Sequence, residues 1–119
     1  MKALVIDDTR TMRLILKNWL NSRAWDVLEA DSGAAARAVA AANPLDLLIV
    51  DLHLPDEDGS DLTQAIRTIP GRENVPALFI STSLFEVECQ AAVSFGPGAY
   101  LLKPLKEQEF LAVADRLVA

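Results

Sequence analysis

A short apolar run that ends abruptly in an acidic residue constrains the fold of this chain most. Residues 47–50 read Leu-Leu-Ile-Val, Asp51 follows, and Pro55, three acidic residues and Gly59 come next. An uninterrupted apolar run of this length, followed by turn signals, is typical of a strand buried on both faces of a parallel sheet. Asp51 would then lie at the carboxyl end of a central strand, where open α/β sheets bind their ligands.

Four further apolar segments read as strands, and helical patterns separate all five. We expect strands at residues 3–6, 25–30, 46–51, 75–81 and 99–102, and helices at residues 10–20, 33–43, 59–69, 83–95 and 106–118. Ser83 and Glu86 have the spacing of a capping box, which predicts that the fourth helix starts there. The alternation predicts an α/β fold, a doubly wound five-stranded parallel sheet with five helices, because parallel strands need crossover connections. The strand order 2-1-3-4-5 is that of known flavodoxin-like sheets and does not follow from the sequence itself.

Length and charge limit the possible functions. The 119 residues are enough for one domain, residues 1–119, and leave no room for a second. The net charge of -6 argues against direct nucleic-acid binding, and no apolar stretch is long enough to cross a membrane. The single cysteine, Cys89, cannot form an internal disulfide, so we expect a small acidic soluble protein in a reducing cytoplasm.

Polar residues at the strand ends suggest a common site. In the order 2-1-3-4-5, Asp7 and Asp8 after the first strand would meet Asp51. Three carboxylates this close repel one another unless a cation joins them, and a small set of oxygen ligands suits Mg²⁺. Lys103 could hold an anion at the same edge, and the Ser81 hydroxyl could donate a hydrogen bond to it. This combination of groups is suited to phosphoryl transfer onto an aspartate.

These residues carry a resemblance to a known family. The chain resembles, nearly end to end, the CheY-like receiver domain of bacterial two-component response regulators. The matching motifs, each weak alone, are Asp7-Asp8, Asp51 with the loop to Gly59, Ser81, Tyr100 and Lys103-Pro104. Ser81 is identified as the family's hydroxyl residue because it lies 22 positions before Lys103.

The resemblance implies a chemistry for the site. Asp51 would accept a phosphoryl group from a sensor histidine kinase or a histidine phosphotransfer protein. Mg²⁺, or Mn²⁺, would be bound by Asp8, Asp51 and the backbone carbonyl of His53, with Asp7 acting directly or through water. Lys103 would pair with the phosphoryl group. The protein would catalyse only its own phosphorylation and dephosphorylation, and would not be an enzyme acting on a metabolite.

The resemblance also implies a switch. Ser81 would move to bond the phosphoryl group, and Tyr100 would turn inward into the space that it leaves. A cis peptide bond is implied before Pro104. A downstream protein would read the change on the surface of the fourth helix, fifth strand and fifth helix, from Leu84 and Phe85 to Tyr100. Nothing in this scheme requires a nucleic acid or a membrane.

Three features near the motifs bear on how the site works. Thr82 stands where the family often has alanine or glycine, so a larger group there would restrict access to the phosphoryl site. Pro97 stiffens the turn between Gly96 and Gly98, which would alter how freely the fourth helix and fifth strand rearrange. The acidic residues 56–58 are expected to form a solvated loop and the start of a helix.

Three other functions are open on these residues. A receiver-like interaction module would signal without phosphate. An aspartate-nucleophile phosphatase would need a second acid two residues after the nucleophile, where this chain has His53. A flavin-binding module would need a phosphate loop rich in glycine and hydroxyl groups after the first strand, where Asp7-Asp8 would repel phosphate.

Overall fold

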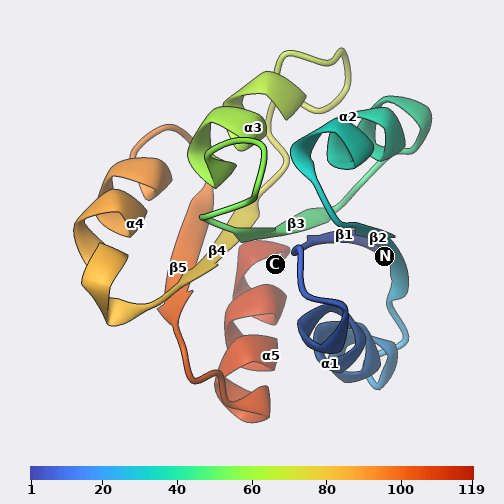
Figure 1. Cartoon of the computed structure of the whole chain (residues 1–119). Coiled ribbons are helices and arrows are strands. Elements are labelled where there is room, and N and C mark those ends of the chain that lie inside the picture. The colour runs from blue at the N-terminus through green and yellow to red at the C-terminus, as the bar shows by residue number, and fades with distance from the viewer.

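The structure, a computed structural model, describes every residue from 1 to 119. Strands and helices alternate along the chain (Figure 1). The strands are β1 (Lys2–Ile6), β2 (Asp26–Ala30), β3 (Leu47–Asp51), β4 (Ala77–Ser81) and β5 (Gly98–Leu102). The helices are α1 (Arg10–Asn21), α2 (Gly33–Ala42), α3 (Gly59–Ile66), α4 (Glu86–Val93) and α5 (Glu107–Leu117), with a 3₁₀ turn, η1 (Ser83–Phe85), before α4.

The strands form one parallel sheet in the order β2-β1-β3-β4-β5. This confirms the expected doubly wound, flavodoxin-like arrangement. Ile6 pairs with Val50, and Asp51 pairs with Ile80. The residues that follow β1 therefore lie beside the end of β3, at the same edge of the sheet as the end of β4.

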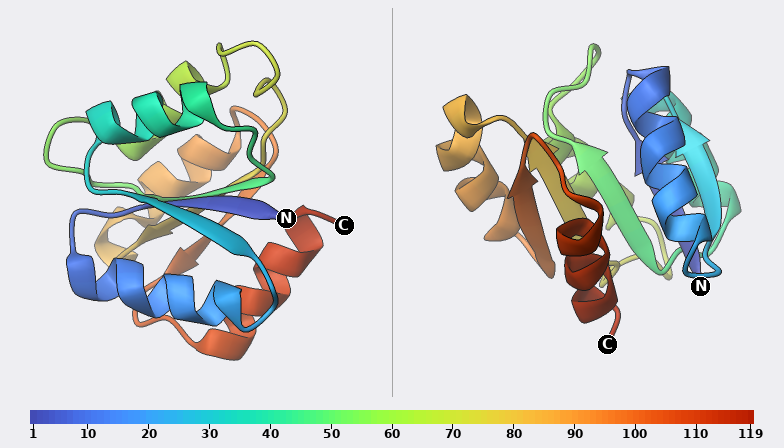
Figure 2. Two further views of the ribbon diagram at one scale, coloured as in Figure 1. Left: turned by 90° about the vertical axis from the view of Figure 1, so that its right-hand side faces the viewer. Right: turned by 90° about the horizontal axis from the view of Figure 1, so that it is seen from below.

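Helices cover both faces of the sheet. Helices α1 and α5 lie on one face, and α2, α3 and α4 lie on the other (Figure 2). Every residue of β3 is buried, with Leu48 and Val50 in the core cluster under α2 to α4, and Leu47 and Ile49 in the cluster under α1 and α5. Because burial of each such side chain stabilises the fold by about 1.5–3 kcal/mol, both faces of β3 select apolar residues. No helix is long and apolar enough to span a bilayer.

Most element boundaries lie within one residue of the expected ones, and those of β4, α3 and α4 differ by more. Strand β4 begins at Ala77 rather than at residue 75, since Pro76 has no N–H group to give to a neighbouring strand. Helix α3 ends at Ile66 rather than near residue 69. Beyond it the chain closes tighter turns, with the N–H of Thr68 donating to the carbonyl of Ala65 over 3.1 Å.

The predicted capping box at the start of the fourth helix is wrong. Ser83 opens η1, and α4 begins three residues later at Glu86. Neither N-cap residue, Thr82 for η1 or Phe85 for α4, makes a side-chain capping bond. The Glu86 carboxylate accepts a hydrogen bond of 2.8 Å from the Tyr100 hydroxyl instead, so a contact with β5 replaces the local one.

Gly59 allows the loop after β3 to fold back on the strand. Its N–H donates to the carbonyl of Leu52 over 2.8 Å. A Cβ atom at this position would lie 2.6 Å from the carbonyl oxygen of Asp51 and 2.9 Å from the Cα atom of Leu52. Any side chain here must therefore displace the backbone of Asp51 itself.

We predict that Gly59→Ala lowers the free energy of unfolding by about 1–3 kcal/mol, the usual cost of forcing atoms into a packed site. Urea denaturation measures the change. Ser60→Ala, at the next position of the same helix, is the matched control and should stay within about 0.5 kcal/mol of the wild type. A Gly59→Ala protein as stable as the wild type would contradict the close backbone approach.

Candidate functional site

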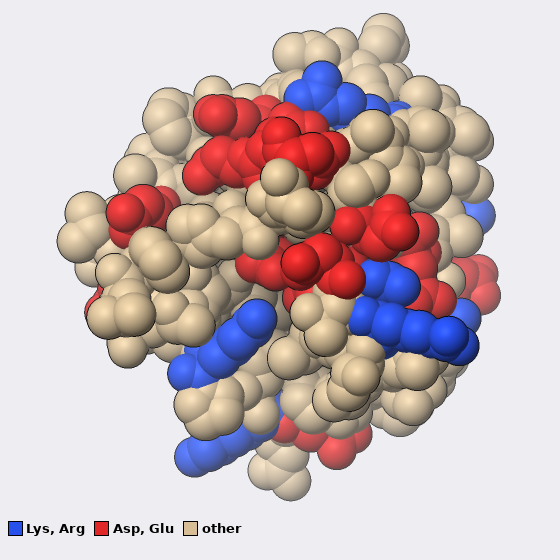
Figure 3. All heavy atoms as spheres, viewed as in Figure 1, with Lys and Arg blue, Asp and Glu red and all other residues tan.

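The carboxyl edge of the sheet collects the polar residues that the sequence places at strand ends. Asp7 follows β1, Asp51 and Ser81 end β3 and β4, and Lys103 follows β5. The space-filling view shows acidic side chains near the centre of this face, with basic side chains on either side (Figure 3). Both signs of charge thus meet at one edge.

Three carboxylates lie together at this edge. One carboxylate oxygen from each of Asp7, Asp8 and Asp51 lies within 4.8 Å of the others. Asp8 is exposed, whereas Asp7 is 1% and Asp51 8% exposed. The cluster is therefore open to solvent on the Asp8 side and enclosed by protein on the other.

Backbone groups fix the two buried carboxylates. The N–H of Thr9 donates to Oδ1 of Asp7 over 2.8 Å, and the N–H of His53 donates to Oδ1 of Asp51 over 3.0 Å. Each bond joins an aspartate to the residue two positions later. The backbone of the loops that leave β1 and β3 therefore orients both carboxylates.

Burial makes the charged forms of these two carboxylates costly. It raises the pKa of Asp7 and that of Asp51 above the ordinary value of an aspartate. The backbone hydrogen bonds and the positive charge of Lys103 oppose the rise in both pKa values, while the neighbouring carboxylates add to it. A cation shared by the cluster would relieve both the burial cost and the repulsion.

This donor set fits Mg²⁺. Carboxylate oxygens are the ligands that Mg²⁺ prefers, and it commonly uses one or two of them together with water. No histidine ring or thiolate belongs to the cluster, which argues against a zinc site. Because Asp8 is exposed, water could supply further ligands to an ion held by this cluster.

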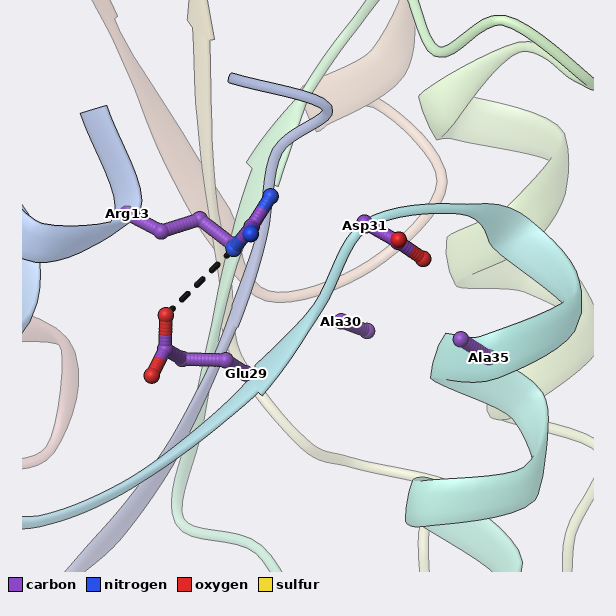
Figure 4. Close-up of a pocket in the computed structure, with 5 residues that line it drawn as sticks. All are labelled: Arg13, Glu29, Ala30, Asp31 and Ala35. Atoms are coloured by element: carbon purple, nitrogen blue, oxygen red, sulfur yellow. Dashed lines mark hydrogen bonds and ion pairs between the residues drawn. The ribbon is translucent and has the colours of Figure 1, made fainter. Parts of the chain in front are cut away.

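An ion-pair network supports the loop that carries Asp7. Arg13, on α1, donates from Nη1 to the carbonyl of Asp7 over 2.8 Å and from Nε to Glu29 of β2 over 3.3 Å. Lys17 approaches the same Glu29 at 3.4 Å. Arg13 and Glu29 line a cavity of about 340 Å³ between α1, the end of β2 and α2 (Figure 4). Sequence reasoning missed Arg13, since its partners depend on the placement of β2 beside β1.

A second cavity, of about 400 Å³, lies over Asp51. Ser81 and Lys103 contribute to it, and the remaining lining residues are His53, Thr82 and Phe85. The Ser81 hydroxyl is buried and has no strong hydrogen-bond partner, since the nearby thiol of Cys89 is only a weak one. Because buried polar atoms are nearly always paired, this hydroxyl points to a ligand that carries an acceptor oxygen.

Tyr100 lies in the middle of β5, and Lys103 directly follows this strand. The N–H of Lys103 donates to the carbonyl of Ser81 over 2.7 Å, and the peptide bond between Lys103 and Pro104 is cis, as the resemblance implied. Tyr100 is half-buried on β5 and donates to Glu86 of α4. It therefore joins α4 to the sheet and does not line the cavity over Asp51.

The acidic loop is less free than the solvated loop expected from the sequence. Asp56 accepts hydrogen bonds from the N–H groups of Gly33 (2.9 Å) and Ala34 (3.2 Å) at the start of α2, which lowers its pKa. Glu57 pairs with Arg37 of the same helix. Asp58 caps α3, as its place before a helix suggested. The loop after Asp51 is thus fastened to two helices.

Comparisons with known proteins agree with this geometry. The family description "response regulator receiver domain" matches residues 3–115. Chemotaxis protein CheY1 of Helicobacter pylori is 36% identical over 110 residues, which cover 91% of this chain and 89% of that protein.

Solved structures show the same fold. The chemotaxis response regulator CheY4 of Vibrio cholerae is 25% identical and superposes with a TM-score of 0.86 over 98% of this chain and 97% of that one. The receiver domain of the sensor histidine kinase PA1611 from Pseudomonas aeruginosa, solved with a magnesium ion in its active-site cleft, is 23% identical with a TM-score of 0.87. The superposition covers 98% of this chain and 96% of the PA1611 receiver domain. At 23% identity, this likeness shows the fold alone.

We predict that Asp51→Asn stabilises the protein when no divalent cation is present. A carboxyl whose pKa is raised by folding keeps its proton to higher pH in the folded state than in the unfolded state. Its ionisation therefore costs stability, a cost that is complete above the raised pKa of the folded state and vanishes as the pH falls below the ordinary pKa of aspartate. We expect calorimetry at pH 7 in EDTA to show a rise in Tm of about 2–5 °C.

Asp56→Asn is the control with the opposite sign. Hydrogen bonds from the start of α2 lower the pKa of the Asp56 carboxyl, so its ionised form stabilises the fold. The substitution should therefore lower Tm. Addition of Mg²⁺ should then raise Tm of the wild type more than that of Asp51→Asn. An unchanged or lower Tm for Asp51→Asn in EDTA would contradict the assigned burial cost.

Proposed function

Since this chain belongs to the response regulator receiver family, we propose that it is a phosphorylation-controlled switch in which Asp51 accepts the phosphoryl group. Receivers of this type are signal transducers that interact with histidine kinases and downstream targets. The observation that carries the proposal is the cavity over Asp51, which contains the cation Lys103 and a buried Ser81 hydroxyl with no strong hydrogen-bond partner. We infer that residues 1–119 form the receiver domain.

We assign the divalent ion to the carboxylate cluster. Asp8 and Asp51, with the backbone carbonyl of His53, would bind Mg²⁺ or Mn²⁺, and Asp7 would act directly or through water. The raised pKa values of Asp7 and Asp51 support this, because a bound cation favours their charged forms. When bound, the ion supplies positive charge that offsets negative charge on the phosphoryl oxygens.

The transfer step uses groups of this chain. An oxygen of Asp51 forms a bond to phosphorus as the bond between phosphorus and the donor histidine nitrogen breaks. The nitrogen keeps the electron pair, and the imidazole becomes neutral or takes a proton from solvent. Lys103, whose charge already acts on Asp51, would pair with a phosphoryl oxygen. Ser81 would donate its free hydroxyl to another.

The enzyme and flavin alternatives have no observation in their favour. A phosphatase would need an acid at position 53 to protonate the leaving group, and the histidine there packs against an aromatic ring. The loop after β1 carries two carboxylates that would repel a flavin phosphate. We therefore infer self-catalysed phosphorylation and dephosphorylation only.

Intact-protein mass spectrometry tests the phosphoryl acceptor. Incubation with phosphoramidate and Mg²⁺ should add one phosphoryl group to the wild type, because Asp51 lines the cavity and a bound cation favours its charged form. The gain should be absent in EDTA and in Asp51→Asn. Asp58→Asn, at an acid of the same loop outside the cavity, is the matched control and should retain the gain. A phosphoryl group on Asp51→Asn would place the acceptor elsewhere.

We further propose that phosphorylation changes the surface formed by α4, β5 and α5. Leu84 and Val87, at the start of this surface, are 86% and 76% exposed, which is unusual for large apolar side chains without a partner. Movement of Ser81 towards the phosphoryl group would free space for Tyr100, whose bond to Glu86 ties β5 to α4. A downstream protein would read this change.

NMR of the phosphorylated protein tests the route through Ser81. Amide shifts on phosphorylation should extend over α4, β5 and α5 in the wild type and in Thr82→Ala. In Ser81→Ala the phosphoryl group should still be gained, but the shifts should stay near Asp51 because the coupling hydroxyl is missing. Equal shifts in α4 and β5 for Ser81→Ala and the wild type would overturn the assigned route.

A further inference from the structure

The side chain of Arg67 joins three segments of the chain at the amino edge of the sheet, opposite the edge that carries Asp51. Arg67 follows α3, Val75 precedes β4, and Pro97 lies in the turn between α4 and β5. Nε and Nη2 of Arg67 donate to the carbonyl oxygen of Val75 over 3.1 and 2.8 Å. Nη2 also donates to the carbonyl oxygen of Pro97 over 2.6 Å. None of the ion pairs of the chain includes Arg67, so its partners are backbone carbonyls alone.

The surroundings of the Arg67 guanidinium are shaped to hold it. A Cβ atom at Gly96 would lie 2.5 Å from Nη1 of Arg67, so the glycine leaves room for the cation. Burial lowers the pKa of Arg67 below the ordinary value of arginine, because the cation is partly removed from water. A planar guanidinium presents its donors in a fixed fork, and hydrogen bonds from a charged donor are about twice as strong as neutral ones. Arg67 therefore holds the turn after α4 firmly.

The backbone fixes the same turn a second time. The carbonyl of Pro97 accepts a further hydrogen bond from the N–H of Ala77 over 3.1 Å. A Cβ atom at Gly98 would lie 2.5 Å from the carbonyl oxygen of Ala77, so β4 and β5 begin in close backbone contact. The C-terminal end of α4 is thus attached both to the sheet and to α3, which lies beside it on the same face (Figure 1).

The N-terminal end of α4 has fewer attachments. The N-cap residues of η1 and of α4 make no side-chain capping bond, and Leu84 and Val87 are largely exposed. The one side-chain hydrogen bond that holds this end runs from Tyr100 to Glu86. This end is also the one nearest the phosphoryl site, since η1 begins two residues after Ser81. The helix is therefore fixed at the end far from Asp51 and loosely held at the near end.

We propose that Arg67 is a positioning residue that fixes the pivot about which α4 moves. The inference rests on the proposed function, because it concerns how phosphorylation displaces this helix. Movement of Ser81 acts on the loosely held end, and α4 swings about the turn at residues 94–97 instead of sliding along the sheet. A swing of this kind displaces Leu84 and Val87 most. Arg67 thereby directs the change to the exposed apolar side chains that a downstream protein would contact.

Amide hydrogen exchange of the unphosphorylated protein tests the anchor by itself. The N–H of Ala77 donates to Pro97, whereas the N–H of Leu52 donates to Ile80 at the opposite edge of the sheet. In Arg67→Ala, the exchange rate of Ala77 relative to that of Leu52 should rise about ten- to a hundredfold, because hydrogen bonds from a charged group are lost. Arg67→Lys keeps the charge without the fork and should give an intermediate rise.

Arg72→Ala is the matched control. Arg72 also donates to backbone carbonyls, those of Ala40 and Pro70, but it does not contact the turn after α4. Loss of this second arginine should leave the ratio of the Ala77 and Leu52 exchange rates at the value of the wild type. An equal rise in Arg67→Ala and Arg72→Ala would assign the effect to general loosening of the edge and overturn the anchor.

NMR of the phosphorylated protein tests the pivot. In the wild type and in Arg72→Ala, the amide shift changes on phosphorylation should fall along α4 and be smallest at residues 94–97. Arg67→Ala should gain its phosphoryl group as the wild type does, since Arg67 lies at the edge opposite Asp51. The shift changes at residues 94–97 should then become as large as those at Glu86, because the end of the helix is no longer held.

The outcomes separate this inference from the proposed function. If the wild type gains no phosphoryl group, the proposed function fails, and the anchor stands or falls on the exchange rates. If the wild type is phosphorylated and residues 94–97 change as little in Arg67→Ala as in the wild type, only the pivot is overturned. Should Arg67→Ala fail to fold, as judged by circular dichroism, Arg67→Lys decides, because an unchanged exchange ratio in that variant also overturns the anchor.

Discussion

The burial of two neighbouring aspartates at the edge of a parallel sheet is the constraint on which the rest of this structure depends. Asp7 and Asp51 are almost fully enclosed and lie beside a third carboxylate, Asp8. Buried like charges are costly unless hydrogen-bond donors and a cation share the site. Two backbone N–H groups and the charge of Lys103 meet part of this need. The cost that remains favours a divalent cation in the cluster, as the proposed phosphoryl transfer requires.

Several residues far from each other in the chain hold this cluster in place. Arg13 fastens the loop after β1 by its bond to the Asp7 carbonyl, and Asp56 fastens the loop after β3 to the start of α2. Gly59 lets α3 begin in contact with the backbone of Asp51. None of these residues needs to touch a phosphoryl group. Each sets the position of a residue that we assign to the proposed metal or phosphoryl site, so the contribution that we expect from them is geometric.

The strands and the convergence at Asp51 could be predicted from the sequence because they follow from local patterns. Uninterrupted apolar runs mark strands buried on both faces, and acids at their ends must meet once the strand order is known. Contacts between distant segments could not be predicted in this way. The pairing of Arg13 with Glu29 and the ring contact of His53 with Phe85 depend on how helices and loops pack. The capping box at Ser83 failed for the same reason, since a tertiary bond to Tyr100 occupies Glu86.

The most direct test of the central claim is the position of a bound cation. A crystal of the protein soaked in Mn²⁺ and measured for anomalous scattering locates the ion without reference to any assumed chemistry. The account predicts one strong peak among the carboxylates of Asp7, Asp8 and Asp51, in contact with Asp8, Asp51 and the carbonyl of His53. A peak elsewhere with none at this cluster, at millimolar Mn²⁺, would contradict the account, because the buried carboxylates would then serve no metal.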